Sequence, residues 1–349
     1  MSGAGGERVL VTGVTGFVAG HCAKHLLDRG YSVRGTVRSL ADPATETLEK
    51  ALAPSAGGRL ELVEADLTDD KGWAAAVAGC AYVQHVASPF PASIPEHVDD
   101  LLAAAVDGTR GVLTACARDG GVRRVVLTSS AAAVIFGHAT RSDQRLDETV
   151  WSNPDGCDAY QKSKTLAERA AWDLVEALPP EQRFDLVAVN PGMVIGPLLT
   201  PRVNTTMEVL GRLLRREVPA SPRMAFAVTD VRDVAAAHRL AMESPAAPGN
   251  RYLCAGENLW MRDIARVLAT RYAKVPTGQL PDFVVRAAGL FDPAVRLAAT
   301  YLGPLERTTS NKAFRELGWT RRDPAATILD AAESLIAFGL APDRRKVRA

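Results

Sequence analysis

The sequence predicts an α/β fold: a doubly wound parallel sheet with a smaller, mostly helical C-terminal substrate lobe. Two observations carry this prediction. Short apolar runs alternate with amphipathic helical segments over the first 197 residues, and a glycine-rich turn joins the first run to the first helix. Beyond Pro197 the alternation weakens, and a chain of 349 residues is long for a single core.

The first strand is expected at residues 9–11, directly before Gly13, Gly16 and Ala19 at the spacing G-x-x-G-x-x-A. Residues 21–28 then carry an apolar helical stripe. A side chain at either glycine would block a tight turn or keep the backbone away from a phosphate, and the unpaired first amides of a helix attract anions. Strand, glycine turn and helix in this order indicate a dinucleotide site.

The next two strands are expected at the adenosine end of this site. The strand at residues 31–38 ends in Arg38, where a dinucleotide fold meets the adenosine ribose. A guanidinium there can hold a 2'-phosphate, which favours NADP; the alternative is a surface arginine. The strand at residues 60–67 ends near Asp66, which could accept from the adenine amino group or cap a helix at residues 69–77.

Two further strands place serines at the expected site. A strand at residues 81–86 is followed by a long helix at residues 97–118, and a strand at residues 124–128 continues into Ser129 and Ser130. Ligands of such sheets lie beyond the carboxyl ends of the strands. Both serines are therefore placed at the site, although serines also follow strands as ordinary turn residues.

A helix at residues 160–172 opens with Tyr160 and Lys164, which are four residues apart and share one helix face. An ammonium near a phenol favours phenolate, so we expect Lys164 to lower the pKa of Tyr160 toward neutrality. The alternative is an ordinary amphipathic surface. The sixth strand, residues 184–189, leads into a loop at residues 190–197 that shapes the floor of the site.

The predicted elements after Pro197 are mostly helical. Helices are expected at residues 203–217, 234–242, 261–272, 311–317 and 325–338, with a short strand at residues 251–253. The dinucleotide-binding domain is predicted at residues 5–197, with residues 226–254 returning to it, and the substrate lobe at residues 198–225 and 255–340.

Composition limits the partners. The net charge of +1 provides no field for nucleic acid or an anionic membrane, and the uncharged run at residues 125–140 fits a strand and loop better than a membrane span. The five cysteines form no C-x-x-C pair, which fits a reducing compartment and no metal site. With no signal peptide in the sequence, we expect a cytoplasmic protein, either a monomer or a homodimer.

The order of the motifs is more specific than any one of them. T-G-x-x-G-F-x-A, D-L, T-S-S-A, Y-x-x-x-K and N-P-G occur in the order that resembles the extended short-chain dehydrogenase/reductase superfamily, which has a Rossmann nucleotide domain. Residues 36–39, 146–148, 163–168 and 230–235 resemble the dihydroflavonol-4-reductases, cinnamoyl-CoA reductases and related microbial aldehyde and ketone reductases. The resemblance extends to about Pro324.

This resemblance implies three catalytic residues. Tyr160 would donate a proton to the carbonyl oxygen, and Lys164 would lower its pKa and bind the nicotinamide ribose. Ser130 would hydrogen-bond the substrate oxygen, with Ser129 as the weaker candidate. These roles agree with the chemistry, because a hydride that reaches a carbonyl carbon builds charge on the oxygen.

The residues assigned to the cofactor lie at the ends of the strands. They are Gly13, Gly16, Phe17 and Val18 at the pyrophosphate, Arg38 at the 2'-phosphate, Asp66 and Leu67 at the adenine, Ala87, Ser88, Pro191, Gly192, Met193 and Val194 after the fourth and sixth strands, and Tyr160 and Lys164 at the nicotinamide ribose. The expected cofactor is NADPH, although no lysine lies close behind Arg38.

The expected substrate pocket is largely apolar. Its proposed walls are Ser88, Phe90, Ser130, Ile135, Met193 and Met224. Plant flavonoid reductases have a polar amide or acid where this chain has Ile135, within the apolar run of residues 131–136. We therefore expect NADPH-dependent reduction of an apolar aldehyde or ketone rather than of a flavonoid.

Two other classes of function stay open. A hydroxysteroid dehydrogenase or a sugar-nucleotide epimerase would use the same fold, and Arg202, Arg212, Arg215 and Arg216 could hold a sugar diphosphate. A non-catalytic cofactor-sensing protein is the other alternative, but such proteins typically lose the tyrosine or the lysine that this chain keeps.

Overall fold

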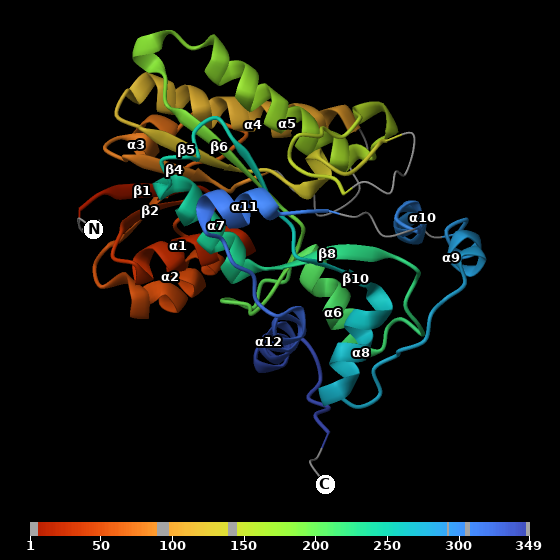
Figure 1. Cartoon of the computed structure of the whole chain (residues 1–349). Coiled ribbons are helices and arrows are strands. Elements are labelled where there is room, and N and C mark those ends of the chain that lie inside the picture. Colours follow the sequence, from red (N-terminus) through yellow and green to blue (C-terminus); the bar gives the residue numbers. More distant parts are fainter. Residues whose placement is uncertain (1–5, 89–97, 139–144, 292, 304–307, 347–349) are drawn as a thin grey trace.

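The computed structural model describes residues 6–88, 98–138, 145–291, 293–303 and 308–346 (Figure 1). At its centre is a seven-stranded sheet in the order β3-β2-β1-β4-β5-β6-β9, in which every neighbouring pair is parallel. The strands are β1 (Arg8–Val11), β2 (Ser32–Val37), β3 (Leu60–Glu64), β4 (Tyr82–His85), β5 (Arg124–Thr128), β6 (Asp185–Pro191) and β9 (Arg251–Cys254). The predicted fold class, a doubly wound parallel sheet, is confirmed.

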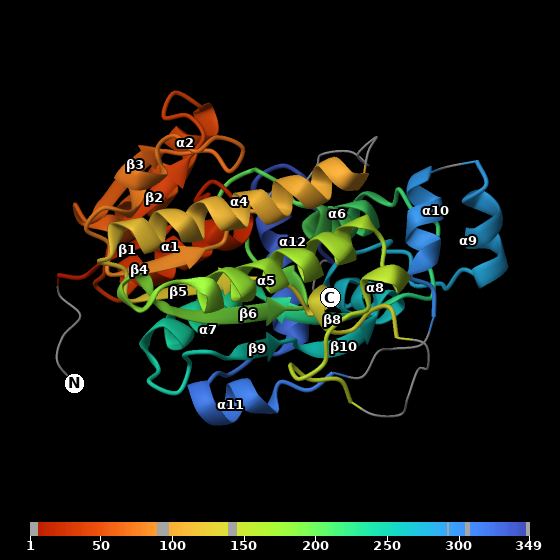
Figure 2. The same ribbon diagram turned by 90° about the horizontal axis from the view of Figure 1, so that it is seen from above.

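Helices cover both faces of this sheet (Figure 2). One face packs on α3 (Trp73–Val77), α4 (Val98–Asp119) and α5 (Ala159–Ala177), and the other on α1 (Phe17–Asp28), α2 (Pro43–Ala56), α7 (Val231–Glu243) and α11 (Asn311–Leu317). Alternate strand residues supply the two cores. Leu10 faces the α4 side, whereas Val9 and Val11 face the α1 side, and all three are fully buried.

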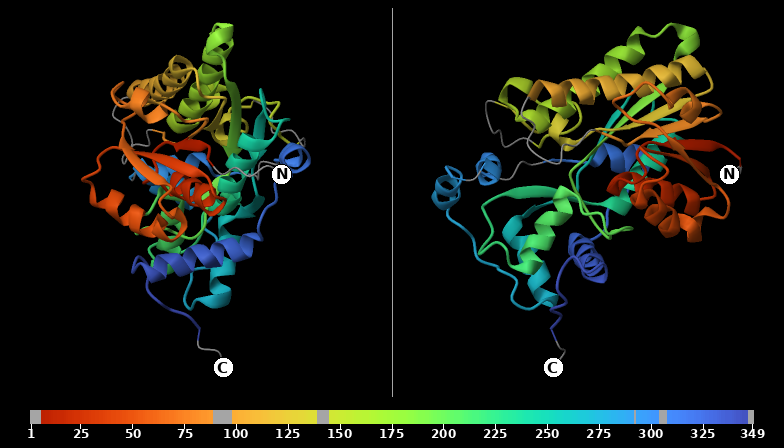
Figure 3. Two further views of the ribbon diagram at one scale, coloured as in Figure 1. Left: turned by 90° about the vertical axis from the view of Figure 1, so that its left-hand side faces the viewer. Right: turned by 180° about the vertical axis from the view of Figure 1, so that it is seen from behind.

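A second, three-stranded sheet follows the sixth strand. It has the order β10-β8-β7 and consists of β7 (Met193–Ile195), β8 (Ala225–Asp230) and β10 (Glu257–Trp260). It packs with α6 (Thr205–Arg215), α8 (Met261–Arg271) and α12 (Pro324–Ala337) around a core that includes Leu210, Ile264 and Ile328. Two short helices, α9 (Asp282–Ala288) and α10 (Pro293–Thr300), lie at the margin of this lobe (Figure 3).

Several predicted bounds differ from the structure. The first helix begins at Phe17 rather than at residue 21, and the helix expected from residue 69 begins at Trp73. Sequence analysis missed β7, β8 and β10. Of residues 226–254, α7 packs against α1 and β9 joins the large sheet, whereas β8 lies in the small sheet. The domain boundaries stay a prediction.

The described residues contain no disulfide bond, no helix that could span a membrane and no metal-binding cluster. All five cysteines are free thiols. Within the described ranges, no helix combines the length and the apolar character that a membrane span requires, and no cluster of acidic, histidine and cysteine side chains could hold a metal ion.

Trp319 ties the C-terminal segment to the nucleotide domain. Its indole is fully buried, stacks on Phe314 at 5.2 Å between ring centroids, and donates from Nε1 to the Asp233 carbonyl at 2.9 Å. We expect Trp319→Ala to lower the free energy of unfolding by about 3–5 kcal/mol, because a buried aromatic side chain leaves a cavity. Phe283→Ala, at a side chain that is 72% exposed, should change it by about 0.5 kcal/mol or less. Denaturant titration measures the free energy of unfolding of both variants. Equal losses would contradict the role of Trp319 in joining the C-terminal segment to the nucleotide domain.

Candidate active site

The glycine turn after β1 lies against the end of β4. Gly13 has a φ of +68°, and a Cβ built on it would lie 2.9 Å from the Cβ of Ala87. Its N–H donates to Oγ1 of Thr36 at 2.8 Å. A Cβ on Gly16 would lie 3.1 Å from the carbonyl oxygen of Gly13. Larger residues at these two positions would therefore push the turn out of the space between β1, β2 and β4.

The first turn of α1 is open to an anion. Gly16 is its N-cap and supplies no capping side chain, and the first N–H bonded within the helix is that of Gly20, to the Gly16 carbonyl at 2.8 Å. The N–H groups of Phe17 and Val18 precede it and, with the helix dipole, attract negative charge. This cradle, which a Cβ would fill, fits the pyrophosphate of a dinucleotide.

Arg38 and Asp66 lie close together beyond the ends of β2 and β3. Asp66 Oδ1 accepts from both the backbone N–H and the hydroxyl of Thr68, each at 2.9 Å. The backbone hydrogen bond contributes most to lowering the pKa of Asp66, and the charge of Arg38 lowers it further. Because the helix after β3 begins only at Trp73, Asp66 does not cap it. Arg38 is exposed, as a group that receives a phosphate must be.

Thr12 fastens the ends of β1 and β4 together beside this turn. Its Oγ1 accepts from the N–H groups of Val86 and Ala87 at 3.0 and 2.9 Å, and lies 3.0 Å from Nδ1 of His85. Burial lowers the pKa of His85 to about 3, so its ring is neutral. The backbone of Ala87 and Ser88, which we assign to the cofactor, is held at the carboxyl edge of the sheet.

Ser130, Tyr160 and Lys164 converge at the same edge. The Ser130 hydroxyl forms a hydrogen bond with the side chain of Tyr160. Lys164 Nζ donates to Oγ of Ser88 at 2.9 Å and lies 6.0 Å from the centroid of the Tyr160 ring. Four residues from three separate segments thus form one connected group, as their positions after β4 and β5 and on α5 predict.

The pKa of Tyr160 differs from the expectation. Burial raises it, the hydrogen bond with Ser130 lowers it in part, and the carboxylate of Asp158 raises it further. The predicted lowering by Lys164 is wrong for this arrangement, because the effect of burial on the phenol dominates. Burial lowers the pKa of Lys164 to about 8.

Ser129 is committed to a buried carboxylate and not to the substrate side. Its hydroxyl donates to Oε2 of Glu168 at 2.5 Å. The same oxygen accepts from Nδ2 of Asn190 at 2.8 Å, and Oε1 accepts from Nε of Arg251 at 2.6 Å. Asn190 Nδ2 also donates to the Ser130 carbonyl at 3.1 Å. We call these four side chains, Ser129, Glu168, Asn190 and Arg251, the carboxylate network.

The carboxylate network was missed by sequence analysis. In the sequence, Glu168 belongs only to a stretch that resembles the family, and Arg251 only begins a predicted strand. A signal was present, since Glu168 lies one helical turn after Lys164 and so belongs to the face that meets the sheet. Arg251 also stacks on Trp151, with the guanidinium carbon 3.6 Å from the ring centroid, and no local sequence pattern pairs these residues.

The proposed substrate walls are only partly described. Ile135 is half-buried against the cluster that contains Val134 and Leu253, and Met193 is half-buried against the core of the small sheet. Met224 is also half-buried. Phe90 lies outside the described residues. These side chains stay predicted pocket residues.

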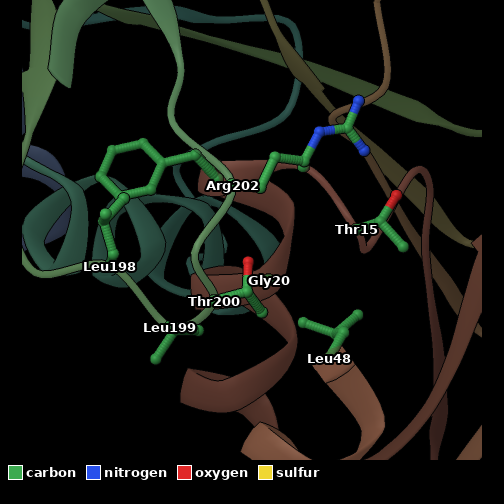
Figure 4. A pocket seen from close by; sticks show the side chains of 9 residues that line it. Thr15, Gly20, Leu48, Leu198, Leu199, Thr200 and Arg202 are labelled. Carbon is green, nitrogen blue, oxygen red and sulfur yellow. The ribbon is translucent and has the colours of Figure 1, made fainter. Parts of the chain in front are cut away.

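A small pocket opens beside the glycine turn (Figure 4). It is lined by Thr15, Gly16, Phe17, Gly20, Leu48, Leu198, Leu199, Thr200 and Arg202. The segment that carries Arg202 crosses the start of α1, and Figure 4 shows the guanidinium extending toward Thr15. Arg202 therefore lies beside the glycine turn.

Comparison with known proteins gives a family match over most of the chain. Residues 9–255 match the NAD dependent epimerase/dehydratase family. The cinnamoyl-CoA reductase CAD2 of Medicago truncatula is 38% identical over 283 residues, which cover 79% of this chain and 83% of that protein.

Two solved structures share the fold over nearly their whole length. Yeast methylglyoxal/isovaleraldehyde reductase Gre2, complexed with NADPH, has a TM-score of 0.77 and 29% identity, with 95% of this chain and 99% of that chain covered. Vestitone reductase from alfalfa (Medicago sativa L.) has a TM-score of 0.71 and 27% identity, with the same coverages of 95% and 99%.

The carboxylate network predicts an asymmetry between buried and exposed carboxylates. Glu168→Gln keeps the shape of the side chain and leaves Arg251 buried without a countercharge, so we expect the free energy of unfolding to fall by about 3–5 kcal/mol. Glu46→Gln removes the exposed partner of Lys50 and should change it by less than about 1 kcal/mol. Equal effects in denaturant titrations would show that the buried pair is not needed.

Proposed function

The chain belongs to the NAD dependent epimerase/dehydratase family, in the branch of the cinnamoyl-CoA reductases, and on that premise we propose that it reduces a small aldehyde or ketone to the alcohol with NADPH. The observation that carries the proposal is the hydrogen-bonded group of Ser130 and Tyr160 next to buried Lys164, at the carboxyl edge of the sheet. Relatives that are reductases support an oxidoreductase.

Tyr160 is proposed as the general acid. Because its pKa is raised by burial, the phenol stays protonated at neutral pH, which is the form that donates to a carbonyl oxygen. NADPH, when bound, supplies the hydride. The hydroxyl of Ser130, already bonded to Tyr160, would donate to the same substrate oxygen and stabilise the charge that develops there.

Lys164 is proposed to hold the nicotinamide ribose and to favour the phenolate left after proton transfer. Its pKa of about 8 leaves it mostly charged at pH 7. The bond from its ammonium to Ser88 holds the side chain in the crevice between α5 and the end of β4. Both roles need the charged form of Lys164, which burial disfavours. A hydroxyl or anion of a bound ligand would stabilise the ammonium in place of the water that burial removes.

NADP is proposed over NAD because Arg38 is exposed at the end of β2, where a dinucleotide fold meets the adenosine ribose. A hydrogen bond holds the backbone just after Arg38: the N–H of Leu40 donates to Oε1 of Glu64 at 2.8 Å. A fixed loop lowers the entropic cost of placing the guanidinium on a 2'-phosphate.

Two of the four arginines that an epimerase could use are already paired with carboxylates. Arg215 pairs with both Glu208 and Glu217 at 2.5 Å, and Arg212 lies 3.8 Å from each of the same carboxylates. The apolar run that includes Ile135 offers no sugar-binding group. These two observations favour a carbonyl substrate of apolar character over a sugar nucleotide.

Tyr160→Phe tests the acid. The variant keeps the ring and loses the proton, so we expect kcat to fall by roughly 10² or more while the Kd for NADPH stays nearly unchanged. Lys164→Ala should lower kcat and also raise the Kd for NADPH. Turnover of aldehydes and ketones and quenching of protein fluorescence by NADPH measure the two quantities; a parental rate for Tyr160→Phe would refute the mechanism.

Arg38→Ala tests the cofactor preference. We expect the Kd for NADPH to rise roughly 10- to 100-fold, as for a lost hydrogen bond to a charged group, with little change for NADH. Arg29→Ala, at an exposed arginine after α1, is the matched control and should alter neither value. Equal weakening of NADPH and NADH by Arg38→Ala would remove the preference for NADP.

A further inference from the structure

Tyr301 joins the marginal helices of the lobe to the helix that carries Tyr160. It follows directly after α10, and its hydroxyl donates to Oδ2 of Asp158 at 2.5 Å. Its ring meets that of Phe136 edge to face, with centroids 6.0 Å apart. Tyr301 therefore contacts both the start of α5 and the segment that follows Ser130.

Asp158 is the residue that starts the catalytic helix. It is the N-cap of α5, where its Oδ1 accepts from the Gln161 N–H at 2.8 Å and its own N–H donates to Oε1 of Gln161 at 3.1 Å. This capping box uses one carboxylate oxygen, and Tyr301 uses the other. Tyr160 lies inside the helical turn that the two bonds fix.

The hydroxyl of Tyr301 stays a hydrogen-bond donor at neutral pH. Burial and the hydrogen bond to Asp158 raise the pKa of its phenol, so it keeps its proton throughout the neutral range. Gln161 also hydrogen-bonds the phenol and lowers its pKa in part, and a negative charge on Tyr160 would raise it. The lobe therefore meets α5 through a charge-assisted bond whose donor does not titrate.

The rest of the marginal segment is fastened mainly to the lobe itself. The Asp282 carboxylate at the start of α9 pairs with Arg223 at 2.5 Å, and the Gly303 N–H donates to the Arg223 carbonyl at 3.2 Å. Between these anchors, the surface of α9 and of the turn after it carries exposed Phe283 and Phe291. Tyr301 is thus a point at which this segment reaches α5.

We propose that Tyr301 is a positioning residue for the reaction: its bond to Asp158 holds the first turn of α5, and with it the phenol of Tyr160, in the orientation that faces Ser130. The residue acts through Asp158 and does not itself transfer a proton. Its effect on turnover rests on the proposed reductase function, whereas its effect on the order of α5 does not.

Tyr301→Phe removes only the hydroxyl and keeps the contact with Phe136. We expect kcat to fall roughly tenfold, because the first turn of α5 loses a restraint, while the Kd for NADPH stays within about twofold of the parent. Tyr31→Phe is the matched control: its hydroxyl donates to Glu243 at 2.7 Å in the same chemistry, away from α5. Equal losses of kcat in the two variants, or none in Tyr301→Phe, would overturn the proposal.

A double-mutant cycle with Asp158→Asn tests the route. The single carbonyl oxygen of the new amide would be used by the cap, so Tyr301 would face an N–H₂ donor instead of an acceptor. If Tyr301 acts through Asp158, adding Tyr301→Phe to Asp158→Asn should change kcat by less than twofold. Additive losses would place the action of Tyr301 elsewhere.

Hydrogen exchange gives a readout that does not depend on turnover. In the full-length protein, Tyr301→Phe should speed exchange of the Gln161 and Lys162 amides roughly tenfold, and Tyr31→Phe should leave them at the parental rate. If the parent reduces no carbonyl with NADPH, the proposed function fails and exchange alone decides the role of Tyr301. Unchanged exchange in Tyr301→Phe would refute that role whatever the activity.

Discussion

The buried carboxylate of Glu168 is the interaction on which the site depends. A charge removed from water is tolerated only if it is paired and hydrogen-bonded, and here Arg251, Asn190 and Ser129 meet that requirement from β9, β6 and the end of β5. Because each partner comes from a different strand, the register of three strands and the placement of α5 are fixed together. Ser130 is the neighbour of one partner and accepts from another through its carbonyl, so the network fixes the backbone that carries the proposed catalytic serine.

Burial acts on Tyr160 and Lys164 in opposite directions. It raises the pKa of the phenol and lowers that of the ammonium, which favours the neutral form of each. The two pKa values therefore lie further apart than those of the free side chains, so the phenol of Tyr160 holds its proton more firmly than the ammonium of Lys164 does. The sequence suggested charge attraction between the two residues; the structure shows that desolvation outweighs it.

Strands of the large sheet and the main motifs could be predicted because their signals are local. Apolar runs mark β1 to β6, and the glycine turn and the Tyr160–Lys164 spacing are read within a few residues. β7, β8 and β10 were missed because short strands are defined by distant partners: β8 pairs with Met193–Ile195 and with Glu257–Trp260. In α2, the cap Asp42 and the first-turn Pro43 were available as signals and were overlooked.

Two anchors hold α5, and they differ in what they connect. Glu168 binds the middle of the helix to the strands that also carry the nucleotide site, whereas Asp158 binds its first residue to the lobe through Tyr301. Tyr160 and Lys164 lie between the two anchors. Lys164 is nearer in sequence to Glu168, and Tyr160 is nearer to Asp158. Lys164, which we assign to the cofactor ribose, is therefore closer along the helix to the anchor on the sheet, whereas Tyr160, the proposed acid, is closer to the anchor on the lobe. In the proposed mechanism, such a division would let the lobe adjust the orientation of the acid without disturbing the binding of the cofactor.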